Sequence, residues 1–132
     1  MPAKIVHLAL KVNDIEESLR FYEQIFGFSH TNTHRAGPLK DHLSCWLSDG
    51  SLGFTLIQYD SEDAPESKAV GKGPCIQHFG IEVPAEELQG YIGKIKAAGC
   101  EIISPPGVLP MKFRGPGGGA ILEVGTPADF PR

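Results

Sequence analysis

Residues 5–12, IVHLALKV, decide the fold, because residues 76–83, IQHFGIEV, repeat them. Both stretches are apolar and of strand length, and each carries a histidine at its third position, His7 in the first and His78 in the second. An ionisable imidazole is unusual in the middle of an apolar strand. Its presence at equivalent positions of two copies predicts two related modules that each contribute one histidine to a common feature.

The repeat continues beyond the strands, since residues 5–27 align with residues 76–99. In each copy a polar hinge follows the strand, and apolar residues then recur at helical spacing. Glycines at positions 27 and 99 stand where helices commonly end. Three short strand-like runs follow each helix, at 28–35, 42–48 and 53–59 in the first copy and at 100–103, 108–114 and 119–125 in the second.

This order predicts an α+β fold of two tandem βαβββ modules. The predicted divisions are a first module at 1–59, a polar linker rich in turn formers at 60–74, a second module at 75–126 and a C-terminal tail at 127–132. Each half is too small to bury a core alone, so the modules are expected to form one cooperative domain.

Composition excludes several classes of function. The chain has 132 residues, 41% of them hydrophobic, and a formal net charge of −4 without runs of Lys or Arg, which disfavours binding to nucleic acid or anionic membranes. No apolar run approaches the roughly 18 residues that cross a bilayer, and no signal peptide is recognisable. The three cysteines, Cys45, Cys75 and Cys100, form no Cys-x-x-Cys pair. A reducing, cytoplasmic location is therefore expected.

Strand alternation predicts where the histidines point. In the first strand the row Val6, Leu8, Leu10 and Val12 is suited to helix packing, so His7 belongs to the opposite face. His78 is placed in the same way in the second copy. Glu123 lies between Leu122 and Val124 in an apolar strand, where a carboxylate is costly unless it is paired or bound.

Two imidazoles and one carboxylate that converge can hold a divalent transition metal and leave other coordination positions open. A single strand histidine is more commonly a hydrogen-bonded core residue, and a single glutamate at a strand end is more commonly a rim residue. The conjunction of His7, His78 and Glu123 favours the metal site over these interpretations.

The motifs HLALKVNDIEESLRFYEQIFGF (7–28), HFGIEV (78–83) and FRGPGGGAILEV (113–124) resemble those of the vicinal-oxygen-chelate superfamily. That family includes glyoxalase I, methylmalonyl-CoA epimerase, fosfomycin-resistance thiol transferases, extradiol dioxygenases and bleomycin-resistance proteins. The resemblance implies paired βαβββ modules whose curled mixed sheets surround a cavity, with the helices on the outside. It also implies one divalent ion, Mn, Fe, Ni, Zn or Co, on His7, His78 and Glu123. The turn at 115–118, GPGG, lacks the acidic residues of the usual family turn.

Many relatives of the glyoxalase and epimerase type have a fourth ligand, Glu or Gln, on the last strand of the first module. Here that strand is GFTLIQYD (53–60), and the equivalent position falls on Thr55 or Leu56. Gln58 would substitute only if the strand register slips. The absence of a matching carboxylate argues against a standard glyoxalase I.

Proton transfer requires a base, and two residues are candidates. Glu82 shares a strand face with His78, although its repeat-mate is Lys11. A place at the cavity rim, where the two residues pair or stay solvated, is favoured over a catalytic role, because exposed ion pairs are common. His42 on the third strand is the second candidate. His30 and His34 are expected at the surface.

Several further side chains are candidates for lining the substrate pocket. They are Trp46, Phe54, Phe113 and Arg114. The guanidinium of Arg114 suits a bidentate contact with a substrate carboxylate, although its place before a turn fits a surface residue as well.

The function expected from this set is a metal-dependent, glyoxalase-like lyase or isomerase, acting on a small substrate that chelates the metal through vicinal oxygens. The alternatives are a thiol transferase of the fosfomycin-resistance type, a small extradiol-type dioxygenase and a non-catalytic ligand-sequestering protein of the bleomycin-resistance type. The region 100–113, CEIISPPGVLPMKF, lacks the Lys, Ser and Arg cluster suited to a phosphonate. Because family modules commonly pair edge to edge, a homodimer is expected.

Overall fold

The computed structural model describes residues 3–115 and 120–132. The chain divides into two compact units. One comprises residues 8–77 with Arg132, and the other comprises residues up to His7 together with the described residues from His78 to Pro131. The first strand of each repeat is therefore divided between the units, directly after His7 and directly before His78. The predicted module boundaries at 59 and 75 follow the sequence repeat, whereas these units are defined by compactness. The boundaries therefore stay a prediction.

The unit of residues 8–77 contains the strand order β2-β3-β4-β1. Strands β2, β3 and β4 are antiparallel neighbours. The bounds of the elements in chain order are β1 Lys4–Lys11, α1 Ile15–Phe26, β2 Ser29–Ala36, β3 His42–Ser48, β4 Gly53–Tyr59 and α2 Pro65–Val70. The short helix α2 lies in the stretch that the sequence predicts as a linker.

The other unit has the strand order β5-β8-β7-β6. Strand β8 runs parallel to β5 and antiparallel to β7, so the sheet is mixed. The bounds of its elements are β5 Cys75–Glu82, the 3₁₀ turn η1 Ala85–Glu87, α3 Leu88–Ala97, β6 Glu101–Ile102, β7 Met111–Arg114, β8 Ile121–Gly125 and the 3₁₀ turn η2 Pro127–Asp129.

Helix α1 is capped at both ends by residues with suitable local chemistry. The Asp14 carboxylate accepts a hydrogen bond of 3.2 Å from the backbone N–H of Glu17, which satisfies one of the free donors of the first turn. At the other end Gly27 has a φ of 70°, a left-handed conformation that glycine adopts without a Cβ penalty. Between these caps Leu19 and Tyr22 pack on the sheet.

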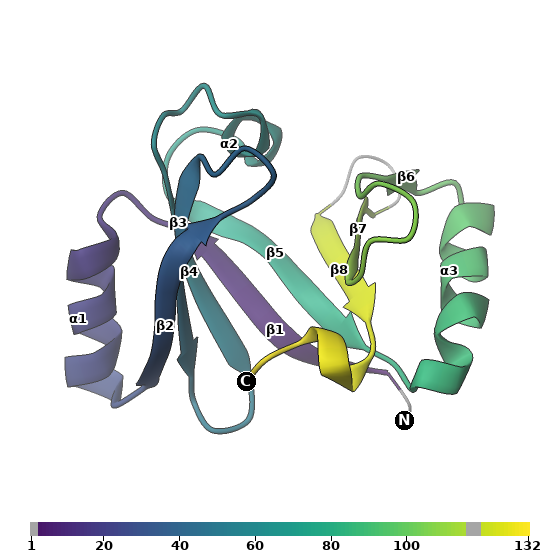
Figure 1. Cartoon of the computed structure of the whole chain (residues 1–132), viewed down its shortest axis with the longest axis horizontal. Coiled ribbons are helices and arrows are strands. Elements are labelled where there is room, and N and C mark those ends of the chain that lie inside the picture. Colours follow the sequence, from purple (N-terminus) through teal and green to yellow (C-terminus); the bar gives the residue numbers. More distant parts are fainter. Residues whose placement is uncertain (1–2, 116–119) are drawn as a thin grey trace. The chain divides into compact units, whose positions relative to one another are not determined.

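Helices α1 and α3 each cover one face of the strands in their own unit (Figure 1). In the first unit Ile15 of α1 packs with Cys45, Leu47, Phe54 and Leu56 of β3 and β4. In the second unit the core holds Val83, Leu88, Met111, Phe113 and Val124, against which the remaining apolar face of α3 packs. Alternate residues of each strand are left on the face without a helix.

The predicted α+β class, with two curled βαβββ arrangements of mixed strands and helices packed on one face, is confirmed. The strands predicted at 28–35, 42–48, 53–59 and 100–103 agree with the observed bounds within one residue at each end. The expected strand at 108–114 begins only at Met111, and that at 100–103 is reduced to two residues, because the proline-rich stretch between them folds as a loop. The predicted turn at 116–118 and the beginning of the strand predicted from residue 119 lie outside the described residues. No described helix is long and apolar enough to cross a membrane.

Replacing Gly27 with alanine should destabilise the protein by about 1 kcal/mol, because φ at this position is positive. The matched control is Gly90→Ala in the middle of α3, where an added Cβ meets nothing within 4 Å and φ is not in the left-handed region. This control should leave the protein equally stable or stabilise it by up to about 1 kcal/mol. Urea denaturation measures both, and equal losses in the two variants would contradict the assignment of the α1 C-cap.

Candidate metal site

Three donor atoms converge in the unit that holds β5–β8. They are the Nε2 atoms of His7 from β1 and His78 from β5, and the Oε1 atom of Glu123 from β8. The two imidazole nitrogens are 3.0 Å apart. Glu123 Oε1 lies 3.0 Å from the nitrogen of His78 and 3.7 Å from that of His7. The structure thus brings together the three residues that the sequence selects as metal ligands.

The strand register explains why Glu123 reaches this point. Strands β5 and β8 pair in parallel with Gly80 opposite Glu123. Leu122 and Val124, the neighbours of Glu123, pack in the core beneath α3, so the carboxylate emerges on the other face. His78 lies two residues before Gly80 on the same face of β5, which places it next to Glu123.

Gly80 is required for close packing at the site. A Cβ at this position would lie 2.9 Å from the Cβ of His7 and 2.5 Å from a ring carbon of Phe130. Phe130 is only 3% exposed, and its ring centroid is 5.9 Å from that of His7. The missing side chain of Gly80 therefore makes room for the two rings that lie side by side.

The turn η2 positions Phe130, a residue that the sequence analysis assigned to the tail. Asp129 accepts hydrogen bonds from the backbone N–H and the hydroxyl of Thr126, at 2.7 and 3.0 Å, and Pro127 occupies the first turn. This capping box directs the chain back to the sheet. The sequence Thr-Pro-Ala-Asp-Phe at 126–130 carries the signal, because a cap residue, a proline and an acid precede an aromatic residue.

Burial and charge act in opposite directions on Glu123. Burial alone would raise the pKa of its carboxyl, but the hydrogen bond and charge of His78, with smaller contributions from Lys112 and His7, hold the pKa below its usual value. The carboxyl therefore stays ionised at neutral pH. The side chains of His7 and Glu123 are each 14% exposed, so the site can be reached from solvent.

The donor set fits a divalent transition metal. Around an ion with bonds of about 2.1 Å, two donors at a right angle lie about 3.0 Å apart and two donors at the tetrahedral angle about 3.4 Å apart. The observed separations of 3.0, 3.0 and 3.7 Å are close to these values. Imidazole nitrogens with one carboxylate oxygen are ligands typical of Zn, Fe, Mn and Ni. Within the described residues, this is the group of three or more such donors that a single ion could join.

Comparison with known proteins identifies the family of the chain. A sequence model of the Glyoxalase/Bleomycin resistance protein/Dioxygenase superfamily matches residues 4–118. The chain belongs to this superfamily. Its matched range contains both histidines and ends shortly before Glu123.

Two curated relatives of this superfamily member are longer proteins. The chain is 29% identical over 103 residues to the virulence protein STM3117 of Salmonella typhimurium, covering 78% of this chain and 65% of the relative. It is 31% identical over 87 residues to the trivalent organoarsenical cleaving enzyme of Bacillus sp. (strain MD1), covering 64% of this chain and 44% of the relative. The chain thus spans less than two thirds of either relative.

A solved structure shows the same fold. A mutant of 4-hydroxymandelate synthase from Streptomyces coelicolor superposes with a TM-score of 0.77 at 23% identity. The match covers 99% of this chain and 39% of the synthase. The curled arrangement of βαβββ units predicted for this superfamily is therefore found in an experimental structure.

Gln58, the candidate for a fourth ligand, makes a hydrogen bond elsewhere in the first unit, and its role as a ligand stays a prediction. Its side-chain oxygen accepts a hydrogen bond of 2.8 Å from the backbone N–H of Ile15 at the start of α1. It shares the helix-covered face with Leu56, which is fully buried in the core. The alternate residues Thr55 and Ile57 are on the other face.

Glu82 and Lys11, for which the sequence suggests an exposed or ion-paired place at the rim, are both buried, and Lys11 is ion-paired. Lys11 is 3% exposed and donates to the Glu62 carboxylate at 3.0 Å and to the carbonyl of Gly71 at 2.7 Å. Glu82 is 6% exposed. Four positions separate Glu82 from His78, about 13 Å along the strand. As a base, Glu82 could therefore act only on a part of the substrate remote from the imidazole.

His42 lies in a polar cluster of the unit of residues 8–77. It is 5% exposed, with Nδ1 3.0 Å from the Asp41 carboxylate and its ring beside Tyr59. Tyr59 donates to Glu66 at 3.1 Å and accepts from Gln77 at 2.9 Å. Burial, followed by the charge of Glu66, raises the pKa of Tyr59, so the phenol stays protonated. The role of His42 as a base stays a prediction.

Two predicted pocket residues, Phe54 and Phe113, pack in the core, and a part in a substrate pocket stays a prediction for both. Phe54 packs edge-on against Tyr22 of α1, with ring centroids 4.8 Å apart. Phe113 is 6% exposed and packs in the core beneath α3. Both lie at the strand positions that face a helix.

Trp46 and Arg114 remain candidates for the pocket. Trp46 is half-buried, donates to the Ser44 hydroxyl at 3.2 Å and meets the His34 ring edge-on. The Nε of Arg114 lies 3.7 Å from the exposed carboxylate of Glu101, its partner in the β6–β7 ladder. That contact supports the surface interpretation of Arg114.

Replacing Gly80 with alanine should destabilise the protein by roughly 1–3 kcal/mol, because the new methyl overlaps His7 and Phe130. It should also lower the affinity for transition metals by displacing the His7 ring. The control is Gly115→Ala, whose Cβ would meet its nearest atom at an ordinary 3.5 Å. Urea denaturation with and without chelator separates the two effects. If Gly80→Ala retains the stability and metal content of Gly115→Ala, the packing described here is incorrect.

Proposed function

We propose that this protein is a divalent-metal-dependent enzyme, a glyoxalase-like lyase or isomerase that acts on a small substrate with two adjacent oxygens. The observation that carries the proposal is the convergence of His7, His78 and Glu123, each pair of donor atoms within 4.8 Å. Three protein ligands leave positions on an ion for two substrate oxygens. The glyoxalase members from which the superfamily takes part of its name support the reaction class.

The residues of the chain have distinct roles in this proposal. His7 and His78 would hold the ion through Nε2, and the ionised Glu123 would offset part of its charge. A bound divalent ion would act as a Lewis acid that stabilises negative charge on the substrate oxygens. Phe130 and Gly80 fix the His7 ring, so the ligand geometry is set before substrate binds.

A non-haem iron(II) dioxygenase is the second candidate. Two histidines and one carboxylate with open positions are the ligand set of such oxygenases. Gln58, the residue considered as a fourth ligand, is bound to the start of α1 instead. The chain resembles an organoarsenical cleaving enzyme over 87 residues. A relative that cleaves a bond is compatible with a lyase and with a dioxygenase. A thiol transferase and a ligand-sequestering protein are weaker candidates, because no observation in the described residues favours them specifically.

Purified protein should contain about one equivalent of Mn, Fe, Co, Ni or Zn per chain. The substitutions His78→Ala and Glu123→Gln should each lower the metal affinity by more than about 100-fold, because each leaves only two protein ligands to hold the ion. His30→Ala is the control, since His30 is exposed on β2 and contacts Thr33. Elemental analysis after dialysis measures the content. A wild-type protein without stoichiometric metal after loading would contradict the proposed enzyme and favour a ligand-binding protein.

Oxygen dependence should distinguish the two leading reactions. A lyase or isomerase should turn over at the same rate in air and under anaerobic conditions, with methylglyoxal and glutathione as the first substrate pair for Ni- and Zn-loaded protein. A dioxygenase should consume one O₂ per substrate and work only with iron, with a catechol as the first probe. An oxygen electrode combined with product detection measures both. Loss of all turnover in His78→Ala is required in either case.

We also propose a homodimer, supported by apolar side chains on the surface of α1. Phe21, Ile25 and Phe26 are 50%, 65% and 59% exposed. Such side chains are typical of surfaces that pack against another protein. Gel filtration or light scattering at the monomer mass of 14.2 kDa would contradict the dimer.

A further inference from the structure

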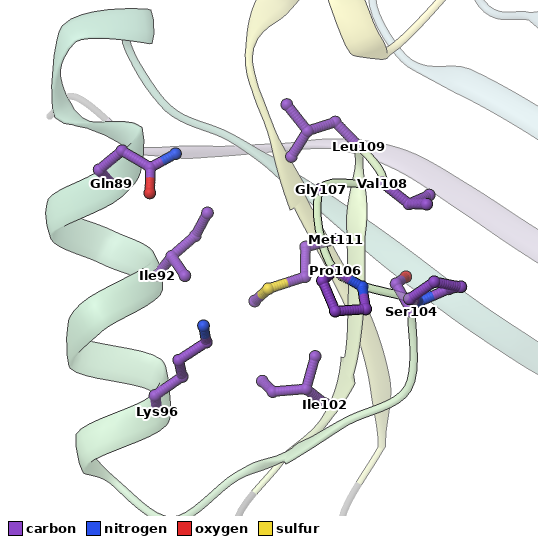
Figure 2. Close-up of a pocket in the computed structure, with 11 residues that line it drawn as sticks. Gln89, Ile92, Lys96, Ile102, Ser104, Pro106, Gly107, Val108, Leu109 and Met111 are labelled. Carbon is purple, nitrogen blue, oxygen red and sulfur yellow. The ribbon is translucent and has the colours of Figure 1, made fainter.

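A pocket of about 500 Å³ lies between α3 and the loop that joins β6 to β7. Its volume is in the range of sites that hold small molecules, roughly 300–1,000 Å³. Figure 2 shows side chains of α3 facing the loop across it. Its lining residues are Gln89, Ile92, Lys96, Ile102, Ser104, Pro105, Pro106, Gly107, Val108, Leu109 and Met111.

Most of the residues that line the pocket are apolar, and Gln89, Lys96 and Ser104 add polar groups. Met111 is 6% exposed and lies at the base, where it joins the core of its unit, and Ile92 and Ile102 pack against that core. At the rim Val108 and Leu109 are 47% and 44% exposed. A pocket that leads from exposed apolar side chains to the core favours a ligand with an apolar body.

The loop wall is held in shape by its own bonds and by prolines. The backbone N–H of Val108 donates to the carbonyl of Pro105 at 3.2 Å, which closes a turn. The Ser104 hydroxyl accepts from the backbone N–H of Lys112 at 2.7 Å, which ties the loop to β7. Prolines restrict the backbone further. The wall is therefore largely formed before a ligand binds, which lowers the entropic cost of binding.

The charged side chain in the pocket lining is positive. Lys96 supplies its ammonium group, and no Asp or Glu is among the lining residues. Within the described part of the chain, no carboxylate lies within 4 Å of the Lys96 ammonium in an ion pair. Figure 2 shows the Lys96 side chain directed towards Ile92 and Met111 rather than away from the pocket. In a protein of net charge −4, this lysine is a local site for an anion.

The pocket is distinct from the candidate metal site, although both belong to one unit. Met111 and Lys112 are consecutive on β7 and point to opposite faces. Met111 faces α3 and the pocket, whereas Lys112 is opposite Glu123 in the β7–β8 ladder. The sheet therefore separates the pocket from the three converging donors.

We propose that this pocket binds a small amphipathic carboxylate, with an aliphatic or aromatic body against Ile92, Ile102 and Met111 and its carboxylate at Lys96. The apolar lining provides most of the affinity through burial. The ion pair is exposed and adds a smaller part, which selects an acid over the corresponding alcohol. The inference stands on the pocket alone and does not depend on the proposed enzymatic activity.

The experiment is a titration of the ¹⁵N-labelled protein with octanoate, followed by amide chemical shifts, with octan-1-ol as the uncharged analogue. Octanoate should produce saturable shifts in α3 and in residues 102–111. Lys96→Met should weaken octanoate binding about three- to fivefold and leave octanol binding unchanged. Lys94→Met is the matched control, because Lys94 lies over the Tyr91 ring, outside the pocket, and should not change either affinity.

Val108→Trp tests the same pocket by filling it from the exposed rim and should weaken both ligands. The octanoate titration is repeated on His78→Ala, so that a carboxylate bound by a metal ion is recognised. Binding that persists there with the same shifts supports the pocket. The proposal is overturned by the absence of saturable shifts, by shifts confined to other residues, by equal affinities for octanoate and octanol, or by equal effects of Lys96→Met and Lys94→Met.

Discussion

The approach of one carboxylate to two imidazoles is the interaction on which the rest of this structure depends. Glu123 is held ionised in a largely buried position because His78 and, to a lesser extent, Lys112 and His7 outweigh the cost of burial. The two imidazole nitrogens and the carboxylate oxygen are largely buried, so each needs a partner. A shared proton or a bound cation supplies that partner. The parallel pairing of β5 with β8 is what brings the carboxylate to His78, since it sets Gly80 opposite Glu123.

The surroundings of the three donors are arranged around that contact. Gly80 lacks a side chain where the rings of His7 and Phe130 need the space, and the capped turn η2 returns Phe130 to the sheet. On the opposite face, Leu122 and Val124 join the core beneath α3. Strand β8 therefore contributes Leu122 and Val124 to the core and Glu123, which lies between them, to the candidate site. The pocket beside Lys96 uses the helix-covered side of the same unit, so the two faces can bind different molecules.

The unexpected placements of several candidate residues share one physical origin. The sequence shows which residues alternate on a strand but not which face the helix will cover at every strand. Phe54, Phe113 and Gln58 are all on helix-covered faces, where the two aromatic rings fill the core and the amide satisfies the free N–H of Ile15. Lys11 is buried because Glu62 and Gly71, from the stretch predicted as a linker, supply partners that compensate its charge. Such partners come from distant segments, so local pattern does not reveal them.

The sequence by itself determined the duplicated βαβββ order, the end of α1 at Gly27, and the choice of His7, His78 and Glu123. These features rest on periodicity and local backbone chemistry, which neighbouring residues express directly. Only the tertiary structure decided that Phe130 packs on His7, that Gln58 caps a helix, and that a pocket opens beside Lys96. Each of these depends on which segments pair and in what register. Pairing is set by the free energy of the whole packed chain rather than by any short stretch of it.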